Sequence, residues 1–515
     1  MFTPEPGFPL GDIPAAYAAE RPGTVAVRCG DAELTWEELH RASDAVARGL
    51  KRTGVGRGHI VPLMLPNGVD VVVAAFACLR IGAVPQPLST RLAPAEEEAI
   101  LALSEPVTVV GPREGAPVGD GRFRSTTVAV LRRLGSVEAA LKTEVGPSWK
   151  APTSGGSTGR PKIILSGAAG AFNPFDMEAW GLRPGERSLV TAPVHHNAPF
   201  FTAMTTLFNG GTVTLLARFD AERVLAEAER HAITWVYLVP TMMRRILALP
   251  APVRARYDLS SLVSVWHCAE PCPPATKQAW IDWLGPERVW ELYAGTEAQA
   301  GCTISGTEWL EHRGSVGRPA WGEIRIVGLD GTPVTGPGVP GEIFMRVDAG
   351  KPPAFRYLGA ELHETDGWST LGDIGEFDAD GYLYLHDRRS DMLLVGGVNV
   401  YPAEIEGALT EHPHVLSSAV IGLPDPDRGN RVHAIVQIEE GRTTTPEELT
   451  AFLAARLSPP QAPQVRRAGH GPAAQRGREA QALGAAGGTP GPNLRLRRRG
   501  RGRTIGRSAC ARRPR

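Results

Sequence analysis

The chain has 515 residues, 42% of them hydrophobic, and its 55 lysines and arginines equal its 55 acidic residues in number. This length allows two or three domains, and this composition is typical of a globular protein with a large core. No apolar run reaches the length of a membrane span, and residues 1–11 lack a signal-peptide pattern. The six cysteines form no disulfide framework or zinc motif, so we expect a cytoplasmic protein with reduced thiols.

The zero net charge hides an uneven distribution along the chain. Residues 457–515 hold 14 arginines, no lysine and one acid, whereas the preceding residues hold 41 basic and 54 acidic side chains. An acidic body therefore precedes a strongly basic tail. The arginines at 495–503 suit an acidic surface. However, no nucleic-acid-binding motif or interleaved aromatic residue accompanies them, so no nucleic-acid partner is expected.

The first part of the chain alternates helix and strand patterns, which is typical of α/β layering. Thr35 and Glu38 form a capping box that opens a helix to about Leu50. Buried strands are predicted at 188–194, 212–216, 234–239 and 263–266, with a helix at 221–231 among them. Later segments predict hairpins at 323–327 and 342–347 and a two-residue turn at Asp380-Gly381.

A smaller α/β unit begins after about Arg389. It holds predicted strands and helices at 392–395, 402–409, 418–421, 433–438 and 446–457. The following residues are rich in Pro, Gly, Ala and Arg without periodicity, a composition that predicts disorder. We therefore expect an N-terminal domain over 1–388, a C-terminal domain over 389–457 and a low-order tail over 458–515.

Residues 153–162 read Thr-Ser-Gly-Gly-Ser-Thr-Gly-Arg-Pro-Lys and are rich in phosphate-binding groups. Glycines let backbone N–H groups approach a phosphate, and hydroxyls and cations add donors. The order does not fit a Walker A loop, which needs Gly-Lys-Ser/Thr followed by a helix. Pro161 and the β-branched residues after Lys162 favour an extended exit. The pattern predicts a polyphosphate-binding loop between two strands, and a Gly/Ser surface turn is the alternative for the loop alone.

Further polar motifs follow in order. They are Tyr293-Ala294-Gly295-Thr296-Glu297, a run over 366–373 that ends in Asp373, Arg388 within 387–391, and Gly396-Gly397 within 395–406. Singly, each is typical of a turn or a cap. Together, in this order, they resemble the adenylate-forming superfamily of acyl-CoA synthetases, peptide-synthetase adenylation domains and luciferases. The resemblance covers about residues 34–457. Stretches 154–157 and 267–272 look most like those of fatty-acid and bile-acid acyl-CoA ligases.

The resemblance implies a large N-terminal α/β domain of stacked sheets and helices with a β-subdomain. It also implies a small mobile C-terminal α/β domain, here truncated or frameshifted before a disordered basic tail. The implied enzyme is an ATP-dependent carboxylic acid–CoA ligase. The acid attacks the α-phosphorus of Mg·ATP to give acyl-AMP and pyrophosphate, and coenzyme A thiol then displaces AMP. The implied ligands are ATP, Mg²⁺, coenzyme A and a small carboxylic acid, and phosphate charge must be neutralised in the first half-reaction.

Roles for individual residues are carried over by motif. Thr296 would bond the α-phosphate, Glu297 would ligate Mg²⁺, and His196 would line the acyl pocket near the carboxylate. A packed core histidine is the alternative for His196. The β- and γ-phosphates would be gripped by Thr153, Ser154, Gly155, Gly156, Ser157, Thr158, Gly159 and Lys162.

The remaining implied positions concern the nucleoside and coenzyme A. Asp373 would accept hydrogen bonds from the ribose hydroxyls, with Arg388 beside it. The adenine slot would lie between Tyr293 on one side and Ala269, Glu270 and Pro271 on the other, and Gly396 and Gly397 would flank the pantetheine tunnel. The domain rotation expected of this family would pivot near Ser390, where Asp or Lys is common.

The chain departs from the family because no lysine follows Lys351. The family's C-terminal lysine reaches the carboxylate and the α-phosphate during adenylation, and losing such a contact costs about 10²–10³ in rate. Two explanations stay open. A one-base shift near Ser458–Pro460 would restore a lysine motif from the codons of 477–483. Alternatively the tail is genuine, and the enzyme performs only thioesterification with a preformed acyl-adenylate.

Two other functions would use parts of the same motifs. An adenylation domain that loads a carrier protein fits the same motifs, but Ala198-Pro199-Phe200 lacks the aspartate of amino-acid-activating domains. A nucleotide-sensing scaffold with a dead site is disfavoured, because the polar residues of the nucleotide motifs are retained. The acid and the oligomeric state are not predicted. The apolar residues that would line an acyl pocket or belong to the core are Phe200, Phe201, Met204 and Trp266.

Overall fold

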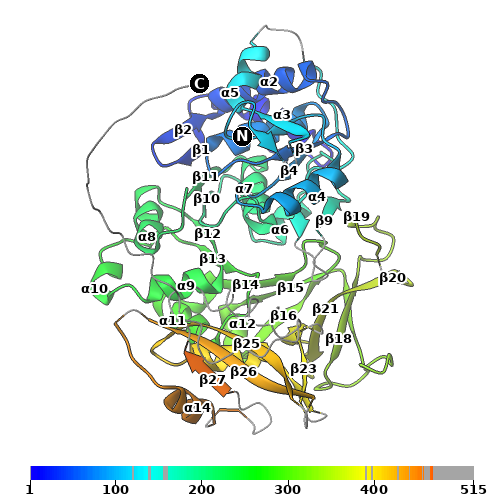
Figure 1. Cartoon of the computed structure of the whole chain (residues 1–515). Coiled ribbons are helices and arrows are strands. Elements are labelled where there is room, and N and C mark those ends of the chain that lie inside the picture. Colours follow the sequence, from blue (N-terminus) through cyan, green and yellow to red (C-terminus); the bar gives the residue numbers. More distant parts are fainter. Residues whose placement is uncertain are drawn as a thin grey trace, which may run out of the picture.

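The computed structural model describes most of the chain up to residue 467. The described ranges are 2–118, 121–136, 141–154, 161–362, 364–388, 391–395, 398–425, 429–439, 441–454, 456–457 and 464–467. Within them the chain forms stacked sheets and helices, which confirms the predicted α/β class (Figure 1). No helix in these ranges is both long enough and apolar enough to cross a bilayer.

A sheet of 14 strands, counted over the described residues, runs through the N-terminal part. One half is parallel, in the order β1-β11-β10-β12-β13-β14. Helices connect its strands, as parallel pairs require. The strands are β1 (Val25–Cys29), β10 (Arg187–Val190), β11 (Thr212–Leu215), β12 (Trp235–Leu238), β13 (Ser264–His267) and β14 (Val289–Ala294). The connections contain α7 (Asn197–Phe208), α8 (Ala221–Arg230), α9 (Pro240–Leu247), α10 (Ala251–Arg254), α11 (Pro274–Leu284) and η2 (Pro286–Arg288).

Beyond β14 the sheet continues with antiparallel strands, which form the expected β-subdomain. They are β15 (Gly301–Ser305), β16 (Ser315–Trp321), β17 (Glu323–Val327), β18 (Gly341–Arg346), β20 (Glu364–Thr365), β21 (Trp368–Phe377) and β22 (Leu383–Arg388), with α12 (Gly306–Glu311) between β15 and β16. At the opposite edge, β2 (Ala32–Thr35) pairs antiparallel with β1.

The N-terminal helices pack around a second sheet. The predicted capping box is present at the start of α2 (Trp36–Arg52). Thr35 Oγ1 accepts from the backbone N–H of Glu38, and Glu38 Oε2 accepts from the backbone N–H of Thr35. The sheet holds β3 (Ile60–Leu63), β4 (Val84–Pro87), β5 (Val109–Val110), β6 (Pro117–Val118) and β7 (Phe123–Thr126). The helices of this part are η1 (Leu10–Asp12), α1 (Ile13–Glu20), α2 (Trp36–Arg52), α3 (Val69–Arg80), α4 (Pro94–Ser104) and α5 (Val128–Leu134). The short α6 (Phe175–Glu178) lies beside α7 instead.

Two smaller sheets complete the structure. One joins β8 (Thr153–Ser154), β9 (Lys162–Ser166) and β19 (Phe355–Leu358). The other forms the C-terminal unit, drawn in yellow to orange in Figure 1. It contains β23 (Leu393–Val395), β24 (Val398–Val400), β25 (Val415–Asp425), β26 (Gly429–Ile438), β27 (Gln464–Arg467), α13 (Pro402–Thr410) and α14 (Pro446–Ala454). This unit has its own apolar core, which includes Ile405, Leu409 and Val436.

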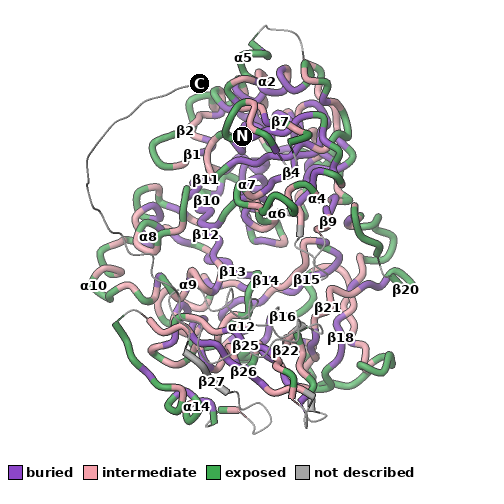
Figure 2. The backbone as a smooth tube through the Cα atoms, in the orientation of Figure 1, coloured by how far each residue is buried: buried purple, intermediate pink, exposed green. Residues whose placement is uncertain are grey.

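Burial follows the sheets, as Figure 2 shows by the buried segments along β10 to β15 and the exposed segments around α8, α10 and α14. Phe200, Met204 and Trp266 are at most 3% exposed and belong to the main core cluster. These side chains therefore pack the core, which was one of the two interpretations left open by the sequence. Phe201 is only half-buried and packs against the same cluster.

Three local expectations differ from the structure. β10 ends at Val190, before Pro193, which has no N–H to donate to a neighbouring strand. The hairpin around Asp380 and Gly381 has a five-residue loop rather than a two-residue turn, because Phe377 pairs with Leu383. β27 lies inside the tail for which no regular structure was expected, where it pairs in parallel with β26.

The crossing of α2 and α5 depends on a glycine. An added Cβ at Gly49 would overlap the backbone carbonyl of Leu131. We expect Gly49→Ala to lower the free energy of unfolding by about 1–3 kcal/mol, although alanine favours helix formation. Urea unfolding measures the change. The control is Gly56→Ala, where no atom lies within 4 Å of the added Cβ, and equal stability of both variants would contradict the prediction.

Candidate active site

The polar motifs gather at one edge of the central sheet. β10, β12, β13 and β14 are parallel neighbours, so their carboxyl ends share that edge. His196 follows β10, residues 269–271 follow β13, and residues 295–297 follow β14. Ligands of open α/β sheets bind outside the carboxyl ends of the strands. The topology therefore brings together side chains that are about 100 residues apart in the sequence.

The predicted phosphate loop is flanked by two strands, as expected. β8 and β9 pair antiparallel, with Thr153 opposite Ile163 and Ser154 opposite Lys162. Several residues assigned to the loop lie outside the described residues, and of Ser154 only the backbone is described. They are Gly155, Gly156, Ser157, Thr158 and Gly159. The contact of Lys162 with Glu297 places the second end of the loop beside the central sheet.

Lys162 and Glu297 meet across two different sheets. Lys162 Nζ lies 3.1 Å from Glu297 Oε1, and the Glu297 side chain is nearly buried, with a relative exposure of 7%. The hydroxyl of Tyr357 donates to the same Oε1 at 2.6 Å. Sequence reasoning missed Tyr357, because an aromatic residue in a strand is typical of a core position. No motif signal distinguishes it from packing residues.

The surroundings of Glu297 suit a hard divalent cation. Its carboxylate supplies oxygen ligands, which Mg²⁺ prefers, and the hydroxyl-bearing Thr296 precedes it directly. The Glu297 carboxylate and the Leu371 side chain both lie close to the backbone of Gly295. An added Cβ at this position would lie 3.0 Å from Glu297 Oε2 and would overlap Leu371. The residues present therefore fit a Mg²⁺ ion bound together with triphosphate.

Two residues assigned to the nucleoside lie in direct contact. The Tyr293 hydroxyl donates to Asp373 Oδ2 at 2.7 Å, which joins the end of β14 to β21. Asp373 also pairs with Arg388 in the register of β21 and β22, so the two residues are neighbours across the strands. The side chain of Arg388 is not among the described parts, and Gly396 and Gly397 lie outside the described residues.

The segment after β13 combines an unusual backbone with a capping side chain. Ala269 has φ 73°, a left-handed conformation that is rare for residues other than glycine. Glu270 Oε2 accepts from the backbone N–H of Thr241 at 3.0 Å and from its hydroxyl at 2.8 Å. The Glu270 side chain therefore caps the start of α9. Residues 269–271 are exposed, so their backbone is accessible to a nucleotide base.

His196 lies directly before α7, next to a second histidine. The ring centroids of His195 and His196 are 4.3 Å apart. Burial lowers the pKa of His195 to about 4, with smaller contributions from His196 and Arg91. His196 keeps an exposed surface, but nearby protein atoms desolvate it and lower its pKa. Both rings are therefore neutral at pH 7, and a neutral ring can donate one hydrogen bond without carrying charge.

A buried charged group lies under the same edge of the sheet. Lys277 Nζ, on α11, is 2.7 Å from Glu291 Oε2 on β14. His267 on β13 is fully buried, and its Nε2 lies 3.8 Å from the same oxygen. Burial lowers the pKa of His267 to about 4, opposed by the nearby Glu291 carboxylate. These residues fix the strands that carry 269–271 and 293–297 onto α11.

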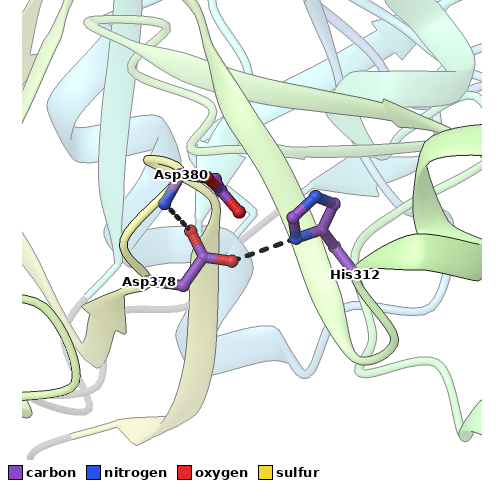
Figure 3. Close-up of side chains that lie close together, drawn as sticks. All are labelled: His312, Asp378 and Asp380. Atoms are coloured by element: carbon purple, nitrogen blue, oxygen red, sulfur yellow. Dashed lines mark hydrogen bonds and ion pairs between the residues drawn. The ribbon is translucent and has the colours of Figure 1, made fainter.

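A separate histidine–carboxylate group joins His312, which directly follows α12, to Asp378 and Asp380 in the loop between β21 and β22 (Figure 3). His312 Nδ1 is 3.1 Å from Asp378 Oδ2, and Tyr384 donates to the same oxygen at 3.3 Å. Asp378 Oδ1 accepts from the backbone N–H groups of Asp380 at 3.0 Å and Tyr382 at 2.8 Å. This carboxylate therefore holds the five-residue loop, and we assign it a structural role.

Lys162, the last residue of the hydroxyl- and glycine-rich motif, contacts the nearly buried carboxylate of Glu297, and Tyr293 bonds Asp373 on a neighbouring part of the sheet. This arrangement at the carboxyl ends of parallel strands is typical of a nucleotide-binding α/β enzyme. The chain belongs to the AMP-binding enzyme family, whose profile matches residues 15–349, and the profile of the AMP-binding enzyme C-terminal domain matches residues 404–468. The resemblance to adenylate-forming enzymes is thus confirmed.

Relatives with named activities cover most of the chain. Feruloyl-CoA synthase from an Amycolatopsis species is 34% identical over 464 residues, covering 87% of this chain and 92% of that protein. Indoleacetate–CoA ligase of Aromatoleum aromaticum is 31% identical, covering 86% and 90%. The structure of o-succinylbenzoate CoA synthetase from Bacillus subtilis with its acyl-adenylate intermediate superposes with a TM-score of 0.76, 26% identity, and coverage of 91% and 95%.

Together these findings confirm the predicted enzyme class, an ATP-dependent carboxylic acid–CoA ligase that uses ATP, Mg²⁺ and coenzyme A. The predicted nearness to fatty-acid and bile-acid ligases is only approximate, because these relatives are named for acids with aromatic rings. The individual site residues and the domain boundaries stay predictions.

The buried histidine predicts a dependence of stability on pH. Below about pH 6.5 the unfolded chain protonates its histidines, whereas the pKa of native His267 is about 4. The unfolded state then binds more protons, so the free energy of unfolding should fall between these pH values. His195 contributes in the same direction.

Urea unfolding at a series of pH values measures this effect. In His267→Gln the fall between pH 6.5 and 4 should be smaller than in the wild type. The matched control is His59→Gln, which removes an exposed ring. The same pH dependence in wild type and His267→Gln would contradict the prediction.

Proposed function

We propose that this ligase activates a planar aromatic carboxylic acid, whose carboxylate lies beside His196. The observation that carries the proposal is a wall of aromatic side chains next to the start of α7. The ring centroids of Phe201 and Trp180 are 5.9 Å apart, and those of Trp180 and Trp266 are 6.0 Å apart. Trp180 and Trp266 are buried in the core and pack behind Phe201, which is only half-buried. The face of Phe201 can therefore stack on a flat aromatic acid.

Lys150 supports an acid whose ring carries an oxygen substituent. It is buried, and its Nζ donates to Asn197 Oδ1 at 2.6 Å. The same ammonium lies 4.7 Å from the ring centroid of Phe201. Since Asn197 directly follows His196, this cation belongs to the neighbourhood of the proposed acyl pocket. The acids in the names of the relatives, such as ferulate, also support an aromatic substrate.

For the first half-reaction we assign charge neutralisation to Lys162 and to the loop that precedes it. The acid's carboxylate oxygen attacks the α-phosphorus, the bond to the bridging oxygen breaks, and pyrophosphate leaves with its negative charge. Mg²⁺ supplies further neutralisation of the phosphates when bound, and Glu297 would hold it. Thr296 donates its hydroxyl to the α-phosphate, and Lys162 holds the leaving pyrophosphate.

For nucleoside binding we assign Asp373 to the ribose hydroxyls, and Tyr293 and the backbone of 269–271 to the two faces of adenine. In the second half-reaction the coenzyme A sulfur attacks the acyl carbonyl, AMP leaves with the electron pair, and the thiol proton goes to solvent. The neutral ring of His196 orients the acyl carboxylate or carbonyl by hydrogen bonding. We place this chemistry in the cytoplasm, where ATP and coenzyme A are available.

We further propose that residues 1–388 form the ATP- and acid-binding domain and that residues 389–457 form a lid, to which β27 adds a strand. The two units are in contact, because Asp387 Oδ2 accepts from the backbone N–H of Ala403 at 2.8 Å. The proposed pivot, Ser390, lies outside the described residues.

A panel of acids tests the substrate proposal. Purified enzyme is incubated with ATP, Mg²⁺ and coenzyme A plus hydroxycinnamic, arylacetic, bile or long-chain fatty acids, and the CoA thioesters are quantified by mass spectrometry. We expect aromatic acids to give at least tenfold higher kcat/KM than long-chain acids, about 1.4 kcal/mol. Preference for a long-chain acid would contradict the aromatic wall as the determinant.

The missing lysine favours a second possibility, a ligase confined to thioesterification. Two assays with the same acid separate the alternatives, one supplying acid, ATP and coenzyme A and the other supplying synthetic acyl-AMP and coenzyme A. If the tail is genuine, turnover from acid and ATP should be lower by about 10²–10³ than from acyl-AMP. Equal turnover would refute the one-sided enzyme.

Sequencing of the coding DNA addresses the frameshift directly. A lysine codon in the shifted frame over residues 477–483 would support it, and a gene without such codons would exclude it. A carrier protein bearing pantetheine, offered in place of coenzyme A, tests the remaining acceptor, because a fatty acid–[acyl-carrier-protein] ligase from Streptomyces coeruleorubidus is 30% identical to this chain.

A further inference from the structure

Tyr357 reaches the proposed active site from a strand that carries none of the site motifs. β19 pairs antiparallel with β9, and Tyr357 lies opposite Ile164. Side chains alternate between the faces of a strand, so Lys162, two residues from Ile164, shares a face with Tyr357. Diagonal neighbours across paired strands are within reach of long side chains. The register therefore places the tyrosine beside the last residue of the phosphate-loop motif.

Tyr357 contacts both partners of the Lys162–Glu297 ion pair. Its hydroxyl donates to Glu297 Oε1 at 2.6 Å, and its ring centroid lies 3.9 Å from Lys162 Nζ. Lys162 Nζ lies 3.1 Å from the same Oε1. A tyrosine hydroxyl is uncharged at physiological pH and carries one proton, so it contacts the carboxylate as a neutral donor.

A divalent cation bound to Glu297 would affect the contact with Lys162 Nζ and the hydrogen bond from Tyr357 differently. The Lys162 ammonium is positive and competes with a cation for the carboxylate, whereas a neutral hydroxyl does not. A carboxylate oxygen has more than one lone pair, so it can accept from Tyr357 and still bind a metal. The ring of Tyr357 also attracts the ammonium independently of Glu297, through its π face.

We propose that Tyr357 is a positioning residue that keeps Glu297 oriented when Lys162 transfers from this carboxylate to the phosphates of Mg·ATP. The inference rests on the proposed roles of Glu297 and Lys162. The hydroxyl holds the carboxylate in place, and the ring keeps the ammonium close to it. The two functions belong to different parts of one side chain, so they can be removed separately.

Two substitutions separate these contributions. Tyr357→Phe keeps the ring and removes the donor to Glu297, so binding of ATP in the presence of Mg²⁺ should weaken about tenfold, while binding of ATP in EDTA should change less than twofold. Tyr357→Leu removes the ring as well, so ATP binding in EDTA should also weaken, by about threefold. Isothermal titration calorimetry with ATP, with Mg²⁺ or with EDTA, measures both, and electron paramagnetic resonance of Mn²⁺ reports metal binding independently.

A matched control exists on the surface. The Tyr257 hydroxyl donates to Glu222 Oε1 at 2.8 Å, so Tyr257→Phe removes the same kind of hydrogen bond away from the site motifs. It should leave both titrations unchanged. Addition of Tyr357→Phe to a Glu297→Gln enzyme should have less effect than in the wild type, because the two residues act through one bond.

Several results would overturn the inference. One is a Tyr357→Phe enzyme that binds Mg·ATP and Mn²⁺ as the wild type does. Another is a Tyr357→Phe enzyme in which ATP binding is weakened equally with Mg²⁺ and with EDTA, which would indicate a general structural role. If the wild type itself makes no thioester and binds no ATP, the proposed function fails, which is a different outcome.

Discussion

The contact between Lys162 and Glu297 is the interaction on which the site depends. It joins the small β8–β9–β19 sheet to the carboxyl end of β14 in the central sheet. A charge pair of this kind is stable only with good geometry, because nearly buried charges lose hydration. The Tyr357 hydroxyl donates a second hydrogen bond to the Glu297 carboxylate. Gly295, which has no side chain, leaves space for this carboxylate. Lys162, at the end of the proposed phosphate loop, and the proposed metal ligand Glu297 are thus joined by direct contacts.

The architecture around this contact was largely predictable, because it follows from local patterns. Apolar runs and a capping box predicted the parallel strands and α2, and the exit at Pro161 predicted a loop between two strands. Such features depend on the chemistry of a few adjacent residues. The prediction of a two-residue turn at Asp380-Gly381 was wrong, because the loop spans residues 378–382. Hydrogen bonds to the backbone and side chain of Asp378 override the preference of Asp-Gly for a tight turn.

The site residues that were missed act through contacts that are remote in sequence. Tyr357 is 60 residues from Glu297, and nothing in its local pattern marks it. The pairing of Lys277 with Glu291 beneath the strand ends is likewise visible only in three dimensions. Resemblance to a family gives the motif residues, whereas the side chains that support them depend on packing, which one sequence does not reveal.

The capping of α9 by Glu270 has a consequence for engineering of the nucleotide pocket. One residue serves two purposes, because its backbone belongs to the proposed adenine wall while its carboxylate anchors the neighbouring helix. A substitution here would alter base recognition and helix anchoring together, so their effects could not be tuned separately. Altered base preference is therefore more accessible through the exposed Pro271 than through Glu270, whose carboxylate anchors α9, or through Ala269, whose left-handed backbone disfavours larger side chains.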